Sequence, residues 1–340
     1  MFVLDNKSKE ELQQLSVALY ENKNFSKEAK AGENAMRKIM YDVLGVEEGA
    51  TMRQIGTAYA QNKAKLFEVI DVAVDAVMPR VVRNEFDGLA NFRNVNPGDS
   101  LVFRNPNHEL FRVARIASGT QDVRRQTGIA SSYTVTTEWY SAATYVEWEQ
   151  FLTGQVDWPA FIEKVALSFE VYISQRIYDA FVQSYDGLRA QEHLRYTGAF
   201  DMGRLIELVE HVKASANSQS ATVYTTASTL AKIAKDLDLS DNMRDEINRV
   251  GFLSLINGIQ FVTFPNMYRA GTNEFLVQHD AFIIVPTGHK IVDVVFEGDT
   301  WTYDTPSEDN TGLQMDFKTQ KKLGIHLNQS AVYGYYKIEA

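Results

Sequence analysis

The 340-residue sequence contains no cysteine. This absence excludes disulfide bonds, thiolate metal sites and cysteine nucleophiles. The six histidines are scattered and no two lie three or four residues apart, so a metal site built from two histidines of one helix is not expected. A glycine-rich phosphate loop and a Gly-x-Ser-x-Gly elbow are missing as well. We therefore expect no cofactor and no metal, and a structural or binding protein is favoured over an enzyme.

Long apolar runs are scarce too. The longest stretch without a charged side chain is Val250–Tyr268, which as a helix would just cross a bilayer core of about 30 Å. Turn signals at Asn257-Gly258 and Pro265-Asn266 interrupt it, and a break there would leave backbone groups unpaired in lipid. We expect no membrane span, and we expect Ile259–Phe264 to be a strand buried in a sheet.

Lysine is absent from residues 66–163, where arginine carries the basic charge. The net charge of the chain is −10, which argues against tight binding of nucleic acid. Residues 80–130 nevertheless hold eight arginines against five carboxylates, whereas residues 131–340 hold 16 basic and 27 acidic side chains. The middle of the chain is therefore either a basic contact segment or an unevenly charged solvated face.

The spacing of apolar side chains predicts several helices. The first helix begins with a capping box at Ser8 and Glu11, and the second ends at Gly45. Further helices run from Thr51 to Pro79, from Asp157 to Tyr185, from 201 to 216 and from 228 to 236. Proline is expected to end the third helix because it lacks the backbone N–H. The helix that begins at Asp157 is the longest of the strong patterns, at about 40 Å.

Strand patterns bounded by turn residues fill most of the remaining sequence. They lie at 100–104, 110–116, 131–140, 221–225, 259–264, 274–277, 281–285, 290–296, 312–319 and 333–338, and a polar capped segment lies at 240–249. The β extension that begins at residue 86 has little apolar content for its length. Because a two-stranded ribbon is marginal on its own, we expect it to pack on something else.

The order of these parts resembles that of the tailed-bacteriophage major capsid proteins, whose fold is shared with encapsulin shells. Residues 157–185 are similar to the family's spine helix, and residues 86–131 are similar to its extended loop. Residues 221–233 look like the strand and helix of its axial domain, and residues 251–267 look like the turn, strand and loop that follow. The resemblance covers residues 65–340 and rests on order and spacing.

This resemblance implies an α+β fold with a phage capsid architecture. Its parts would be an N-terminal helical arm, an extended β loop with flanking strands, a peripheral domain with the spine helix, an axial domain, and strands that return to the peripheral domain, at 1–80, 81–140, 141–215, 216–289 and 290–340. The implied function is that of a major capsid protein, which self-assembles into the icosahedral shell around the double-stranded DNA genome of a tailed phage. Such a protein should expose its loop and its arm in the isolated subunit.

The implied partners are further copies of the chain, in pentamers and hexamers. Scaffold, portal and decoration proteins are further candidates, packaged DNA is expected to bind only weakly and non-specifically, and no membrane is involved. The implied location is the virion capsid, after assembly in the host cytoplasm. Candidate loop contacts to a neighbouring subunit are Arg104, Arg112, Arg115, Arg124 and Arg125. Candidate residues near a symmetry axis, where uncharged side chains avoid repulsion between copies, are Asn257, Gly258, Pro265, Asn266 and Met267.

Two features differ from the family pattern. Family members lose an N-terminal segment by proteolysis, but Met1 is present here, so we expect no such cleavage. Some members cross-link a loop lysine to an asparagine of a neighbour, and the lysine-free interval removes that nucleophile. The alternatives to a phage shell are an encapsulin-type nanocompartment shell, a cytosolic α/β enzyme with an unrecognised site, and a monomeric receptor-binding or adhesin module.

Overall fold

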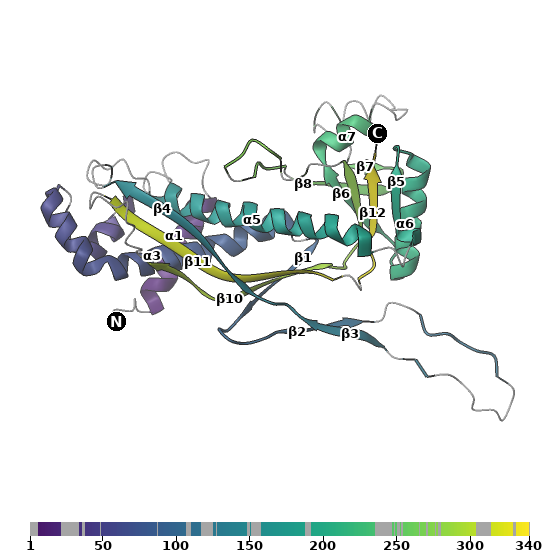
Figure 1. The fold of residues 1–340 in the computed structure, drawn as a ribbon, viewed down its shortest axis with the longest axis horizontal. Coiled ribbons are helices and arrows are strands. Elements are labelled where there is room, and N and C mark those ends of the chain that lie inside the picture. Colours follow the sequence, from purple (N-terminus) through teal and green to yellow (C-terminus); the bar gives the residue numbers. More distant parts are fainter. Residues whose placement is uncertain are drawn as a thin grey trace.

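The computed structural model contains a four-stranded sheet, a six-stranded sheet and a two-stranded ribbon (Figure 1). Helix α5 (Trp158–Gly187) runs along the four-stranded sheet and reaches the six-stranded sheet. The structure describes residues 6–21, 34–35, 38–47, 49–86, 88–106, 110–116, 125–126, 128–147, 150, 158–187, 192–234, 247, 249, 252, 254–264, 266–269, 271–275, 277, 280–303, 314–328 and 331–339.

The four-stranded sheet combines strands from distant parts of the chain. Its order is β1-β10-β11-β4, with β1 parallel to β10 and the other pairs antiparallel. The bounds are β1 (Ala90–Val95), β4 (Glu138–Glu147), β10 (Val292–Tyr303) and β11 (Gln314–Leu327). Tyr140 of β4 packs on Tyr172 of α5, with ring centroids 4.9 Å apart, whereas Trp139 and Tyr145 are exposed. One face of the sheet is thus covered by helices, and part of the other face is open.

Helices α1 (Asn6–Glu21) and α3 (Met52–Phe86) pack with α5 beneath this sheet. Leu66 and Ile70 of α3 and Ile173 of α5 are fully buried in the shared core. The expectation of an exposed N-terminal arm is wrong for α1. Its Leu12 is only 4% exposed, and the Lys9 ammonium lies 3.1 Å from the Glu68 carboxylate of α3.

Two details of these helices differ from the sequence prediction. Ser8 lies inside the first turn of α1 rather than before it, so the capping box is wrong. Helix α3 continues through Pro79 to Phe86. A proline inside a helix costs about 3 kcal/mol because a hydrogen bond is lost. Val77 and Met78, directly before it, are 2% and 0% exposed, and this burial keeps the helix docked.

The six-stranded sheet forms the second core. Its order is β5-β12-β9-β6-β8-β7, with bounds β5 (Arg195–Gly198), β6 (Ala221–Thr226), β7 (Leu255–Ile256), β8 (Ile259–Phe264), β9 (Ala281–Pro286) and β12 (Gly334–Ile338). Along β9, Ile283 packs toward α3 and α5, whereas Phe282 and Ile284 pack toward α6 (Met202–Ala216). Because both faces are covered, β9 reads as a continuous apolar run. Helix α7 (Ala227–Ile233) follows β6 directly, and η2 (Glu192–Leu194) precedes β5.

Most of the predicted elements in this half of the chain are confirmed. Strand β8 has the predicted bounds, and α5, α6, β6, β9 and β12 agree with prediction to within two residues. The strand predicted at 274–277 is wrong, since Phe275 forms only a single bridge with Tyr268. Most of the polar segment predicted at 240–249 lies outside the described residues. The division of the chain into five domains stays a prediction.

The ribbon consists of β2 (Val102–Pro106) and β3 (Ile129–Thr134), and it points away from both sheets (Figure 1). The strand predicted at 110–116 is wrong, because no described strand pairs with these residues. A strand needs a hydrogen-bonded neighbour as well as a suitable pattern. None of the described helices is both long enough and apolar enough to cross a membrane. The uncharged stretch that begins at Val250 instead supplies β7 and β8.

Candidate inter-subunit surfaces

The root of the ribbon is fixed to β10 by two hydroxyl–carboxylate pairs. Tyr133 donates a hydrogen bond to Oδ2 of Asp293, and Thr137 donates one to Oε2 of Glu297. The two hydroxyl residues are four positions apart in the sequence, and so are the two carboxylates, so both carboxylates face the same side of β10. Asn91 of β1 donates to the other oxygen of Asp293 at 3.1 Å. These bonds set the direction in which the ribbon leaves the sheet.

Glu297 connects two further segments to the root of the ribbon. It accepts hydrogen bonds from the Gly98 N–H at 2.8 Å and from the Lys322 ammonium of β11 at 2.7 Å. The hydrogen bonds from Lys322, Thr137 and Gly98 lower the pKa of Glu297 to about 2. The carboxylate is therefore charged at any physiological pH, and it holds the segments before β2 and after β3 on the sheet.

The segment that follows β3 contacts β11 at Gly324, which has no side chain. A Cβ at Gly324 would lie 2.5 Å from the carbonyl oxygen of Thr136, which only glycine avoids. Tyr133 stacks between Phe103 of the ribbon and His326 of β11, with ring centroids at 5.4 and 4.5 Å. Burial lowers the pKa of His326 and favours its neutral form. The root is therefore both packed and hydrogen-bonded.

The ribbon and the segment 110–116 that extends from β2, which we include in the ribbon from here on, expose apolar side chains. The exposed fractions are 58% for Val102, 73% for Leu110, 60% for Phe111, 98% for Val113 and 51% for Ile116. The backbone of Arg112 is held by the Gln126 side chain, with hydrogen bonds of 3.1 and 3.3 Å. A contiguous exposed apolar segment of this kind is typical of a protein–protein contact.

The structure places the predicted loop arginines along this ribbon. Arg104 lies on β2, and Arg112, Arg115 and Arg125 lie beyond it. All four are exposed, and Arg124 lies outside the described residues. The exposed segment 110–116 thus alternates apolar and basic side chains, and it offers both kinds of contact to a partner.

The predicted symmetry-axis residues fall at the two ends of β8. Asn257 and Gly258 have φ angles of 50° and 77°, and they form the two-residue turn between β7 and β8. Two positive φ angles define a type I′ turn, for which Asn-Gly is the favoured sequence. Both residues are exposed, and the neighbouring Leu255 is 57% exposed. The tip of this hairpin is therefore uncharged and projects from the sheet.

At the other end of β8, Asn266 closes a loop. Its Oδ1 accepts a hydrogen bond from the Val277 N–H at 3.1 Å, and its Nδ2 donates to the Val277 carbonyl at 3.3 Å. Met267 is partly buried, and Pro265 lies outside the described residues. The predicted residues are thus split between a hairpin tip and a loop base.

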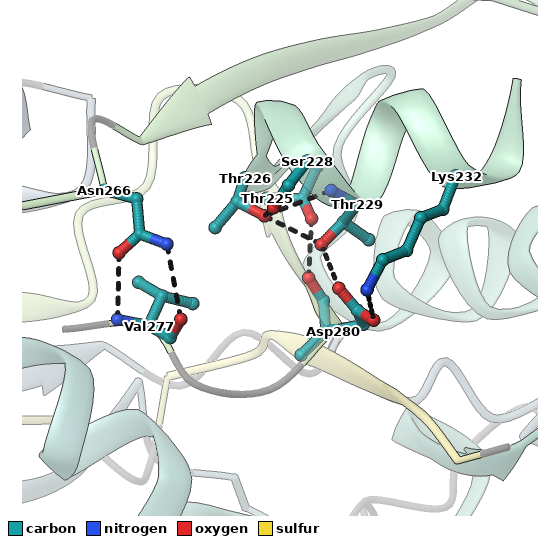
Figure 2. A network of polar contacts seen from close by, with 9 residues as sticks. Thr225, Thr226, Ser228, Thr229, Lys232, Asn266, Val277 and Asp280 are labelled. Atoms are coloured by element: carbon teal, nitrogen blue, oxygen red, sulfur yellow. Dashed lines mark hydrogen bonds and ion pairs between the residues drawn. The ribbon is translucent and has the colours of Figure 1, made fainter. Parts of the chain in front are cut away.

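A pocket lies between this loop base and α7, at the carboxyl ends of the parallel strands β6 and β8. We call it the hydroxyl pocket; its volume is about 580 Å³ and its lining includes Thr226, Ser228, Thr263, Phe264, Phe275 and Asp280. Figure 2 shows Asn266 and Val277 on one side and the hydroxyl side chains of α7 on the other.

The α7 side of the hydroxyl pocket is held by a chain of hydrogen bonds. The Thr226 and Thr229 hydroxyls lie 2.8 Å apart, and Thr229 donates to Oδ1 of Asp280 at 2.9 Å. The Lys232 ammonium lies 2.5 Å from Oδ2 of Asp280. Among the described residues, no three histidine, aspartate or glutamate side chains gather as a metal site would require. The lining of the pocket therefore combines hydroxyl groups with the aromatic rings of Phe264 and Phe275.

Sequence reasoning did not single out the residues at the ribbon root. Tyr133, Thr137, Asp293 and Glu297 are common residue types in strand patterns, and their pairing spans 160 positions. The hydroxyl residues and the carboxylates share a spacing of four positions. This spacing indicates their pairing only once β3 and β10 are known to be neighbours. The aromatic residues Tyr268 and Phe275 were missed in the same way.

The sequence matches a family model over residues 11–337, and that family is described as "SPbeta prophage-derived putative capsid protein YonB". The chain belongs to the YonB family. Its resemblance to tailed-phage capsid proteins is thereby confirmed, and a YonB-family chain has a structural role in the virion capsid. No curated protein matches the sequence.

This YonB-family chain is also similar to solved capsid subunits. It resembles a mature capsid subunit of bacteriophage PhiM1, with 12% identity, a TM-score of 0.49, and coverage of 74% of this chain and 86% of that one. For the capsid of cyanophage P-SCSP1u the identity is 10%, the TM-score 0.47, and the coverage 75% and 88%. For a virus-like particle from Pyrococcus furiosus the identity is 10%, the TM-score 0.44, and the coverage 77% and 97%.

Proposed function

We propose that this chain is the major capsid protein of a tailed phage and that it forms pentamers and hexamers in an icosahedral shell around double-stranded DNA. The observation that carries the proposal is the match of nearly the whole chain to a capsid protein family. The exposed ribbon supports it, because a shell subunit must leave contact surfaces uncovered until neighbours arrive. The chain acts through assembly rather than catalysis, and assembly takes place in the host cytoplasm.

The ribbon lies on a neighbouring copy in this proposal. Val113 is 98% exposed and Leu110 is 73% exposed, and burying a side chain of this size contributes about 1.5–3 kcal/mol. Contacts of this strength are modest singly, but each subunit is held by several neighbours at once, so avidity multiplies them. The fixed root keeps the ribbon in one direction before assembly, which lowers the entropy lost on contact.

The ribbon arginines pair with carboxylates of that neighbour. The charge imbalance supports this step, since residues 131–340 hold 27 acidic against 16 basic side chains. Exposed pairs contribute about 0–1 kcal/mol each, so they order and orient the contact more than they hold it. The uncharged turn at Asn257 and Gly258 faces copies of itself around a symmetry axis, where like charges would repel.

Particle formation by the purified full-length chain tests this function. We expect particles of megadalton mass by size-exclusion chromatography with light scattering, and closed shells by negative-stain electron microscopy. Scaffold or portal proteins co-expressed with the chain should change particle size or uniformity, not the ability of the chain to self-associate. A stable monomer or dimer under all assembly conditions would overturn the proposal.

A further inference from the structure

Two aromatic rings project from the loop that follows β8. Tyr268 and Phe275 stack with ring centroids 4.8 Å apart and an interplanar angle of 18°. They are 53% and 47% exposed. We call this pair the aromatic prong. An exposed aromatic pair costs hydration free energy in the isolated subunit, and Tyr is enriched at protein–protein contacts.

The described backbone around the prong makes hydrogen bonds within its own loop. The Arg269 N–H donates to the Glu274 carbonyl at 2.8 Å, and the Thr272 N–H donates to the Arg269 carbonyl at 3.0 Å. Gly271, at the tip, has a φ angle of 76°, which glycine adopts without strain. The side chain of Asn266 closes the base of the loop, as Figure 2 shows. Binding through the prong therefore orders little additional chain.

The prong is also tied to the body of the subunit. The Arg269 guanidinium lies 4.0 Å from the Asp179 carboxylate of α5, and both side chains are about one-third exposed, at 31% and 33%. This contact and the Asn266 clamp connect the prong to two different elements. The prong therefore has contacts both to α5 and to the loop base at the end of β8.

The hydroxyl pocket next to the prong matches the chemistry of a tyrosine side chain. Phe264 and Phe275 supply aromatic walls, and Ser228 and Thr263 supply hydroxyl groups. A tyrosine has an apolar ring and a polar tip, so it can use both kinds of lining. Phe275 lines the pocket of its own chain, whereas Tyr268 is not part of that lining.

A charged side chain lies beside each of the two features. Glu274 is exposed next to Phe275 on the prong, and Lys232, 65% exposed, lines the hydroxyl pocket, where its ammonium also pairs with Asp280. One copy approaching another with Tyr268 first brings Glu274 of the first toward Lys232 of the second. Such a pair steers the approach and fixes its register more than it adds affinity.

We propose that Tyr268 of one copy inserts into the hydroxyl pocket of the next copy, with Glu274 facing Lys232. Phe275 belongs to both features, whereas Tyr268 lies outside the pocket lining. When the Tyr268 of each copy enters only the pocket of the next copy, the contact is head-to-tail, and a head-to-tail contact that closes forms a ring. The inference rests on the proposed self-assembly, and it assigns one contact within each ring of subunits.

Two single-cysteine variants test the contact, since the natural chain has no cysteine. Tyr268→Cys and Ser228→Cys subunits are mixed, assembled and mildly oxidised. We expect a covalent dimer at twice the 38.5 kDa chain mass in the mixture, and no such band from either variant assembled alone or from unassembled subunits. A disulfide between two different variants can form only between copies. The matched control mixes Ser228→Cys with Tyr145→Cys, an aromatic position that is 62% exposed on β4, and should give no dimer.

Side-chain variants give an independent readout. Tyr268→Ala should lower particle yield at least tenfold, and Tyr268→Phe should lower it less because the ring is retained. If the wild type assembles but the first mixture gives no dimer above the control, the prong contact is overturned and the capsid function stands. If the wild type does not assemble, both proposals are overturned.

Discussion

The phenol of Tyr133 donates a hydrogen bond to the carboxylate of Asp293, which lies 160 residues later in the chain. Asp293 is 3% exposed, so its carboxylate oxygens need hydrogen-bond donors from the protein itself. The bond joins the base of the ribbon to the centre of the four-stranded sheet. It therefore links the position of a surface that reaches outward to the core of the subunit.

Replacing Tyr133 by phenylalanine should loosen the ribbon root. The ring stack with Phe103 and His326 is retained, but Asp293 loses a donor and keeps only Asn91 among its side-chain partners described here. Removing a hydrogen bond to a charged group costs about 1.5–3 kcal/mol. We expect a loss of that order in the free energy of unfolding, measured by urea titration, with lower particle yield. Tyr145→Phe, on the exposed face of β4, should change neither by a measurable amount.

Asp71 makes the stability of the subunit depend on pH. It lies on α3 against the sheet, where Oδ1 is buried without a partner among the described residues. Burial, with the nearby Asp75 carboxylate, raises the pKa of Asp71 to about 7, although hydrogen bonds from Thr302 and the charge of Lys321 oppose the rise. The folded state then holds a proton that the unfolded chain loses near pH 4. This group should therefore lower stability progressively between about pH 4 and pH 7, by on the order of 2–4 kcal/mol in total.

Asp71→Asn isolates that effect. Asparagine keeps the shape of the side chain but carries no charge, so the fall in unfolding free energy between pH 4 and pH 7 should be smaller than in the wild type. Urea titrations at pH 4.5, 6 and 8 measure it. Asp42→Asn, at an exposed position, serves as the control and should retain the wild-type slope. An unchanged slope in Asp71→Asn would show that another group titrates.

The helices and strands that the sequence predicted correctly are those determined by residues within or next to the element itself. Strand β8 follows an Asn-Gly turn and alternates in and out, and both signals lie within ten residues. Helix α5 carries its own apolar stripe and a proline in the first turn. The strand expected at 110–116 failed because pairing depends on a partner strand, and the described residues supply none. Pro79 did not end α3 because burial against the sheet outweighs the lost bond.

The predicted sites were located only in part. The arginines of the ribbon and the Asn257-Gly258 turn were found because charge and turn chemistry are visible in the sequence. The carboxylates that fix the ribbon were not, because Asp293 and Glu297 acquire their role only when β10 lies beside the ribbon root. A buried polar contact between distant strands has no local signal, and the arrangement of the strands must be known first.

The turn at Asn257 and Gly258 should not accept ordinary residues. Both φ angles are positive, and a left-handed conformation costs about 1–2 kcal/mol for a residue with a Cβ. Gly258→Ala should therefore destabilise the β7–β8 hairpin and reduce assembly, as measured by thermal unfolding and particle yield. Gly128→Ala, where the nearest atom to a new Cβ is 4.0 Å away, is the matched control. Equal effects of both substitutions would contradict a specific role for the turn.

The assembled shell should bind packaged DNA only weakly. A net charge of −10 on each copy leaves few basic side chains that could neutralise phosphates and release counterions from DNA. We expect assembled particles to bind double-stranded DNA weakly, without sequence preference, and with an affinity that falls from 50 to 200 mM salt. Fluorescence anisotropy with two unrelated duplexes measures both. Nanomolar binding of one sequence at physiological salt would be incompatible with this expectation.

The shell should be held without covalent cross-links, partly by ribbon arginines on an acidic neighbour. The absence of lysine from residues 66–163 removes the nucleophile that an isopeptide bond from the ribbon would require, and arginine stays protonated at any working pH. Boiled, denatured particles should therefore run as one band near 38.5 kDa. A ladder of covalent multimers would refute the non-covalent model.

Arg124→Glu with Arg125→Glu should leave the subunit folded but reduce assembly, most strongly at low salt, where exposed charges are least screened. Lys38→Glu with Arg53→Glu makes the same change of charge at two exposed positions outside the ribbon and should reduce assembly less. If the two double variants assemble equally well, the electrostatic contribution of the ribbon is excluded.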